Sequence, residues 1–139
     1  MGERDQAAAV EAVHEVVMRT EAAISAPLAE LGLTTATAQA LWALDPDEEP
    51  PSMKVVAGRL FCNAPNLSFV ADQLAARGLV ERVPDPHDRR SRALVLTDRG
   101  RQVRSEVLRI VAECSPLSAL GPDDLAALLS ILDKVRSGP

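Results

Sequence analysis

Three arginines, Arg89, Arg90 and Arg92, lie close together around a segment rich in turn-forming residues, PDPHDRRS at 84–91. Guanidinium groups stay charged at neutral pH and present a planar fork of N–H donors, which suits phosphate oxygens and grooves of negative potential. Residues 77–104 hold eight arginines against four acids, although the chain of 139 residues has a net charge of −5. This charge segregation predicts a basic face for an anionic polymer; the alternative is a solvated charge run without a partner.

A β-hairpin is predicted to hold these arginines. The runs LVERV (79–83) and RALVL (92–96) have the composition of short strands, and the residues between them are turn formers. We therefore expect a two-stranded wing over 79–96 with a long, arginine-bearing tip.

The residues before the wing predict a helix-turn-helix. After an acidic, proline-rich loop at 45–52, Ser52 is a suitable N-cap for a helix that runs through Phe61. Asn63 is a suitable N-cap for a second helix, which Gly78 ends. The two or three residues between these helices are the short connection of a helix-turn-helix.

Further helices are predicted on both sides of this region. The apolar residues of 6–31 follow one helical stripe, and Pro27 is expected to kink or end that helix near Ala23. A short helix begins at Thr34 and closes at Asp45-Pro46. The core must be aliphatic, because aromatic residues are only 2% of the chain.

Two more helices are predicted after the wing. Thr97 caps the first of them, and the second opens at Gly121 with acids in its first turn. The predicted fold is mainly α with a small β-hairpin wing, a winged helix-turn-helix plus a helical dimerisation region. The expected parts are an N-terminal dimerisation helix (1–31), the winged helix-turn-helix (32–101) and C-terminal dimerisation helices (102–139).

The run LAARGLVERVPDPHDRRSRALVLTDRGR, at 74–101, closely resembles the winged-helix segment of MarR-family regulators. The matching wing motif is Asp88-x-Arg90, followed by Leu94, Leu96 and Thr97. The resemblance implies a non-enzymatic regulator of transcription that binds double-stranded DNA. It implies a homodimeric repressor on a pseudo-palindromic operator, released by a small phenolic or lipophilic effector. It also implies that Arg90 enters the minor groove and that Asp88 orients it.

The second helix of the helix-turn-helix would then read DNA bases. On a helical wheel its inward residues are Leu67, Val70, Ala71 and Leu74. Asn66, Ser68 and Gln73 lie on the outer side as possible hydrogen bonders, and Phe69 could touch a thymine methyl group or fold back onto the domain. Asp72 and Gln73 depart from the basic residues that relatives often carry here. This predicts either weak base readout or a site read largely by shape and phosphate contacts.

Several residues have two possible roles. The resemblance suggests Met18, Trp42 and Met53 as lining of an effector pocket, and core packing is the alternative for each. Glu11, His14 and Glu15 could suggest a metal site, but three ligands on one helix usually form a solvated face, and we expect no metal. Cys62 is either a redox-sensitive thiol or a buried structural one, and His87 is expected to contact phosphate or water.

Other classes of protein are not favoured. The chain shows no Ser/His/Asp grouping and no phosphate-binding Gly-rich loop, so neither enzyme activity nor a cofactor is expected. No apolar run approaches the roughly 18 residues of a membrane span, and cytoplasmic location is expected. The alternative function is a winged-helix protein-interaction module that has lost DNA binding, prompted by the acidic net charge.

Overall fold

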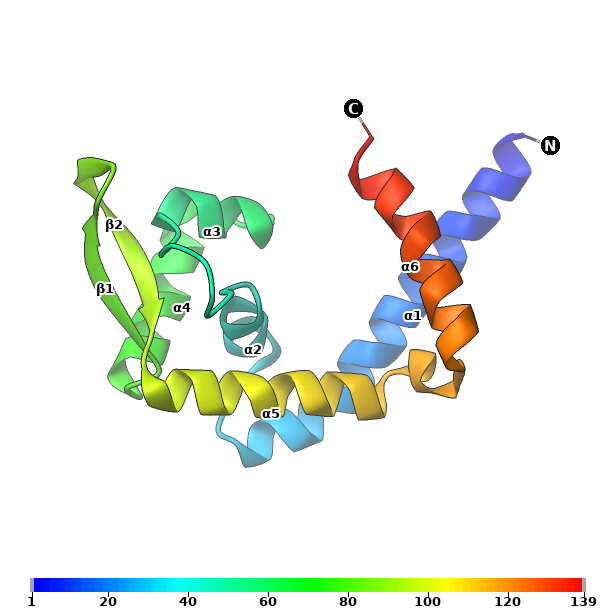
Figure 1. Ribbon diagram of the computed structural model, residues 1–139. Coiled ribbons are helices and arrows are strands. Elements are labelled where there is room, and N and C mark those ends of the chain that lie inside the picture. Colours follow the sequence, from blue (N-terminus) through cyan, green and yellow to red (C-terminus); the bar gives the residue numbers. More distant parts are fainter. Residues whose placement is uncertain (1, 139) are drawn as a thin grey trace. The chain divides into compact units, whose positions relative to one another are not determined.

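The computed structural model describes residues 2–138, which divide into two compact units. One unit is Ser25–Ile110; the other combines the residues up to Ile24 with those from Val111 onward. Helices α1 (Glu3–Glu30) and α5 (Asp98–Cys114) contribute residues to both units (Figure 1).

The unit of residues 25–110 contains the predicted winged helix-turn-helix. Its elements in chain order are α2 (Thr35–Trp42), α3 (Met53–Arg59), α4 (Ala64–Ala76), β1 (Val80–Asp85) and β2 (Asp88–Leu96), followed by most of α5 (Figure 1). The two strands form one antiparallel sheet. The predicted fold class, mainly helical with a two-stranded wing, is therefore confirmed.

Side-chain caps start the helices of this unit where the sequence predicted them. Thr34 and Thr37 form a reciprocal capping box at α2. Ser52 accepts from the Val55 N–H at 3.1 Å, and Asn63 accepts from the Asn66 N–H at 2.9 Å. Each bond satisfies a backbone donor that the first helical turn leaves without a partner.

The ends of α3 and α4 are set by positive φ angles. The φ of Phe61 is 53°, so α3 ends at Arg59 and not at Phe61 as predicted. The φ of Gly78 is 72°, which ends α4 and turns the chain into β1. Glycine adopts this region freely, whereas a bulky side chain is strained there.

Aliphatic side chains fill the core of the unit. Leu28, Leu41, Val56, Leu74 and Leu94 are almost completely buried. One close backbone approach completes the packing: a Cβ built on Gly100 would lie 1.9 Å from the Leu79 carbonyl oxygen. The first turn of α5 can therefore meet the base of the wing only because residue 100 has no side chain.

The strands of the wing are longer than predicted and its turn is shorter. The predicted strands at 79–83 and 92–96 extend to Asp85 and back to Asp88, leaving Pro86 and His87 as the turn. The register shifts next to this turn, because Pro84 pairs with Arg92 whereas Asp85 pairs with Asp88. Residues 89–91 therefore belong to β2 but have no Cα partner on β1.

Helix α1 differs from the prediction at both ends. It begins at Glu3, not residue 6, and continues through Pro27 to Glu30 instead of ending near Ala23. Proline removes one N–H donor but does not end this helix. Arg77 bonds the exposed carbonyls that follow, donating from Nη2 to Leu31 at 2.7 Å and from Nη1 to Gly32.

The other unit combines the first part of α1 with the end of α5, a 3₁₀ turn (Pro116–Ala119) and α6 (Pro122–Arg136). The Thr20 and Ser115 hydroxyls lie 3.3 Å apart and join two segments of this unit. Among the described residues of α6 none is fully buried. No helix among residues 2–138 is long and apolar enough to cross a membrane.

Candidate nucleic-acid interface

Helix α4 has one buried face and one exposed polar face. Leu67, Ala71 and Leu74 are buried, as the wheel predicts. The opposite side exposes the predicted reading residues Asn66, Ser68, Phe69 and Gln73. Phe69 is 64% exposed, so it does not fold back into the core.

The predicted wing arginines are all exposed. Arg89 and Arg90 lie on the unpaired stretch of β2, and Arg92 lies opposite Pro84. The Asp88 carboxylate accepts from the backbone N–H of Arg90 at 2.9 Å. Asp88 therefore holds the backbone of Arg90, because a carboxylate readily bonds the N–H two residues further along the chain.

A hollow of about 680 Å³ lies where α3, α4 and the wing meet. Three cationic side chains line it: Lys54 from α3, Arg82 from β1 and Arg92 from β2. Ser68 and Ser91 add hydroxyl groups to the same surface. Such a lining suits the sugar-phosphate backbone of a nucleic acid. The sequence did not predict a role for Lys54, because it is an isolated charge that only the fold brings to the wing.

Arg82 also forms a salt bridge with Asp72. Its Nη1 atom forms a salt bridge with the Asp72 carboxylate, and its Nη2 atom donates to the Ser68 carbonyl oxygen at 3.0 Å. The prediction treated Asp72 as an uncompensated acid on the reading face. The structure instead gives it a cationic partner ten residues later, on β1.

The acidic loop before α3 supports the other side of the wing. The Leu94 N–H donates to the Pro51 carbonyl oxygen at 3.0 Å. At the turn, His87 Nε2 lies 2.9 Å from Glu49 Oε1. The hydrogen bond with Glu49 and its negative charge raise the pKa of His87 above its usual range. His87 therefore has a carboxylate partner within the chain, which the sequence analysis did not foresee.

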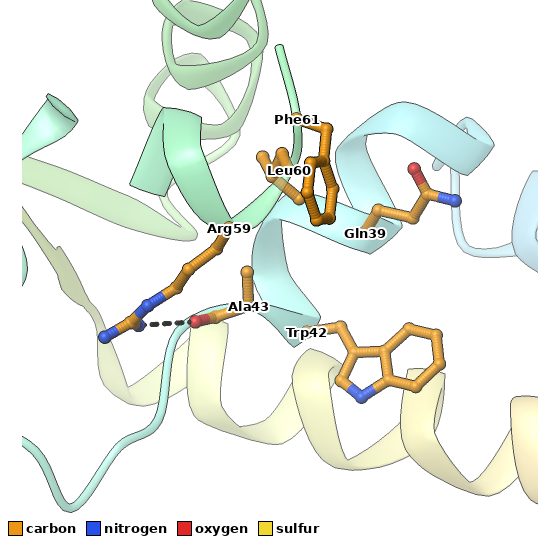
Figure 2. Close-up of a pocket in the computed structure, with 6 residues that line it drawn as sticks. All are labelled: Gln39, Trp42, Ala43, Arg59, Leu60 and Phe61. Carbon is orange, nitrogen blue, oxygen red and sulfur yellow. Dashed lines mark hydrogen bonds between the residues drawn. The ribbon is translucent and has the colours of Figure 1, made fainter. Parts of the chain in front are cut away.

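Trp42 and Met53, suggested for an effector pocket, line two different hollows of the unit of residues 25–110. Trp42 borders a hollow of about 430 Å³ together with Gln39, Ala43, Arg59, Leu60 and Phe61 (Figure 2). Met53 is not among these lining residues; it lies at the start of α3 and lines the hollow at the wing instead. Met18 belongs to the other compact unit, where it is 44% exposed.

The remaining candidates show no built site. Cys62 and Cys114 are free, half-buried thiols. Glu11, His14 and Glu15 are exposed on α1. Within residues 2–138 no group of three or more His, Cys, Asp or Glu side chains is arranged to hold a metal ion.

Comparison with known proteins gives consistent matches. Residues 31–91 match the profile of the MarR family. The chain is 31% identical over 87 residues to YkoM of Bacillus subtilis (strain 168), an uncharacterized HTH-type transcriptional regulator. That alignment covers 61% of this chain and 56% of YkoM, so the chain spans little more than half of that relative.

Solved structures match over most of the chain. The transcriptional repressor CouR bound to a 23-mer DNA duplex has 31% identity and a TM-score of 0.72, over 90% of this chain and 89% of that one. CouR from Rhodococcus jostii RHA1 bound to p-coumaroyl-CoA has 21% identity and a TM-score of 0.76, over 91% and 90%. BldR from Sulfolobus solfataricus has 29% identity and a TM-score of 0.78, over 99% of both chains. With its wing motif and winged helix-turn-helix, this chain belongs to the MarR family of HTH-type transcriptional regulators.

Proposed function

We propose that the chain regulates transcription by binding duplex DNA through α4 and the wing. The observation that carries this proposal is that Lys54, Arg82 and Arg92 line one hollow with Ser68 of α4, while the polar residues of α4 and the wing arginines are exposed. The DNA-bound structure of CouR, a relative of similar fold, supports it.

The geometry suggests a role for each group. Helix α4 lies in the major groove, where Asn66, Ser68 and Gln73 bond base edges and Phe69 contacts a thymine methyl group. Lys54 and Arg92 bind the phosphates that lie between the two grooves. Arg90 enters the neighbouring minor groove, whose negative potential favours a guanidinium.

We propose that the active form is a homodimer. Val10, Val13 and Val17 on α1, and Leu129 and Ile131 on α6, are large apolar side chains left exposed in the single chain. Exposed apolar surface of this kind is typical of a protein interface. A two-fold dimer would cover it and present two copies of α4 to the half-sites of a pseudo-palindromic operator.

We further propose that the chain is a repressor that a small phenolic or lipophilic effector releases from DNA. The hollow beside Trp42 supports this role, because the Trp42 and Phe61 rings border it (Figure 2). CouR, which has been solved with p-coumaroyl-CoA, supplies the precedent in a protein of the same fold. An effector should lower the affinity for DNA and quench the fluorescence of the single tryptophan.

A gel-shift experiment with fragments of the host genome tests the DNA-binding proposal. Retention of particular fragments that weakens steeply with added salt is the expected result, because cation–phosphate contacts release counterions. Absence of retention at low salt, with capture of a defined protein partner instead, would support the protein-interaction module.

A further inference from the structure

Arg82 joins the wing to the DNA-reading helix. It lies on β1, where it pairs in register with Leu94 on β2. Its guanidinium contacts the carboxylate of Asp72 and the carbonyl oxygen of Ser68, both on α4. Ser68 and Asp72 are four residues apart, one turn of the helix, so the guanidinium fork spans one turn on the exposed side of α4.

Arg82 lies near the base of the hairpin, opposite the buried Leu94, and the outer part of the wing extends beyond it. Among the described residues of the hairpin, burial is confined to Val80, Ala93, Leu94 and Leu96, which lie at its base. The contacts of the wing with Pro51 and Glu49 come from the loop before α3, not from α4. A hairpin end without buried side chains belongs to the low-stability parts of a fold, so each added contact matters for its order.

We propose that Arg82 and Asp72 are positioning residues, which fix the angle and distance between the wing and α4. This inference rests on the proposed function, because it matters only if both elements contact one duplex. The spacing between the major and minor grooves is set by the DNA. A wing already held at the matching spacing avoids the entropic cost of ordering it during binding, and Arg90 then reaches its groove without rearrangement.

Because Asp72 is negatively charged, the inference can be tested by whether Asp72→Asn strengthens or weakens DNA binding. Its carboxylate side chain is 65% exposed on a face that would approach DNA phosphates. If only charge mattered, Asp72→Asn would strengthen DNA binding, because it removes a negative charge and leaves Arg82 free to meet a phosphate. If Asp72 positions the wing, the same substitution weakens binding.

Titration of an operator duplex selected from genomic fragments provides the first measurement. We expect Asp72→Asn to weaken binding about tenfold, the size of one specific contact. Glu81→Gln is the matched control, since Glu81 is the exposed acid beside Arg82 on β1. It should leave binding unchanged or slightly tighter. Arg82→Lys keeps the charge but loses the fork, and should resemble Asp72→Asn.

A double-mutant cycle tests whether the contact acts through the wing. Arg90→Ala should cost about tenfold in the wild-type background and about twofold in the Asp72→Asn background, because a displaced wing no longer uses Arg90. Equal costs in both backgrounds, or tighter binding by Asp72→Asn, would overturn the positioning role.

NMR relaxation of the free protein tests the contact without DNA. Backbone order parameters of residues 86–91 should fall in Asp72→Asn and stay unchanged in Glu81→Gln. If the wild type binds no duplex but these order parameters fall, the proposed function fails and the wing–helix contact stands. Unchanged order in Asp72→Asn contradicts the positioning role whatever the DNA result.

Discussion

The two compact units of the chain differ in how far their apolar side chains are buried. The unit of residues 25–110 has a buried aliphatic core, which includes Leu41 and Val56. In the other unit Val10 is 69% exposed and Val135 is 72% exposed. Burial of apolar surface is the main favourable contribution to folding, so the first unit can stabilise itself, whereas the second needs a further surface. A second copy of the chain would supply that surface.

The largest expected effect is a loss of stability in the unit of residues 25–110. Gly100→Ala places a Cβ against the Leu79 carbonyl oxygen, where no flexible side chain can move aside. The first turn of α5 must shift away from the wing, at a cost of about 3 kcal/mol in the free energy of unfolding. Thermal unfolding should show this loss as a melting temperature lower by about 10 °C.

Gly58→Ala is the matched control for that substitution. No atom lies within 4 Å of a Cβ built on Gly58, which is inside α3. Alanine favours a helix by about 1 kcal/mol over glycine, so this variant should melt slightly higher than the wild type. Equal melting temperatures for the two variants would contradict the packing described for Gly100.

The second effect concerns the unit with exposed apolar residues. Leu129→Glu puts a charge on α6 at a side chain that is 57% exposed in the single chain. If a second copy covers this surface, burying the charge disfavours the dimer, and the mass measured by light scattering should fall from about twice 14.8 kDa toward one chain. Val55→Glu, an exposed position on α3, should leave the dimer intact. A monomeric wild type at micromolar concentration would contradict the interface.

A smaller effect on stability is expected at Phe61, where the backbone of the unit of residues 25–110 is strained. Its φ is 53° and its side chain is 97% exposed, so the ring gains little from burial. Phe61→Gly should relieve the strain and raise the free energy of unfolding by about 1 kcal/mol. Phe61→Ala removes the ring but keeps the strain and should bring no gain. The comparison fails if alanine stabilises the protein as much as glycine does.

The smallest effect is the pH dependence of the His87 contact. Because Glu49 raises the pKa of folded His87 above its ordinary value of 6.5, the stabilisation is full below that value and is lost as the pH rises through the folded pKa. In Glu49→Gln an NMR titration should move the His87 midpoint down toward 6.5. A midpoint that does not move would show that the pair is absent in solution.

The sequence predicted the elements of the winged helix-turn-helix well because their signals are local. Ser52 and Asn63 cap their helices through bonds to residues three positions away, and the inward face of α4 follows from its periodicity. The prediction that Pro27 could end the first helix was wrong, because α1 continues through it to Glu30. The wing arginines were found as a run of like residues in the chain.

The contacts that assemble the candidate site were not predictable, because they join distant positions. From the sequence, Asp72 is a negative charge on a face expected to meet DNA, and only the fold shows its salt bridge with Arg82. Lys54 is an isolated charge in the sequence, and only the fold shows that it lines the hollow at the wing. The register shift at Pro84 made the tip shorter than its turn-rich composition suggested.

We propose that an arginine of the wing, together with α4, binds DNA. Fluorescence anisotropy with an operator duplex selected from genomic fragments tests it most directly, comparing the wild type with Arg90→Ala and with Arg99→Ala, an exposed arginine on α5. We predict that Arg90→Ala weakens binding by about 1–3 kcal/mol, roughly 5- to 150-fold, with its melting temperature unchanged, and that Arg99→Ala costs clearly less. Equal losses for the two variants, or no binding by the wild type at low salt, would contradict this account.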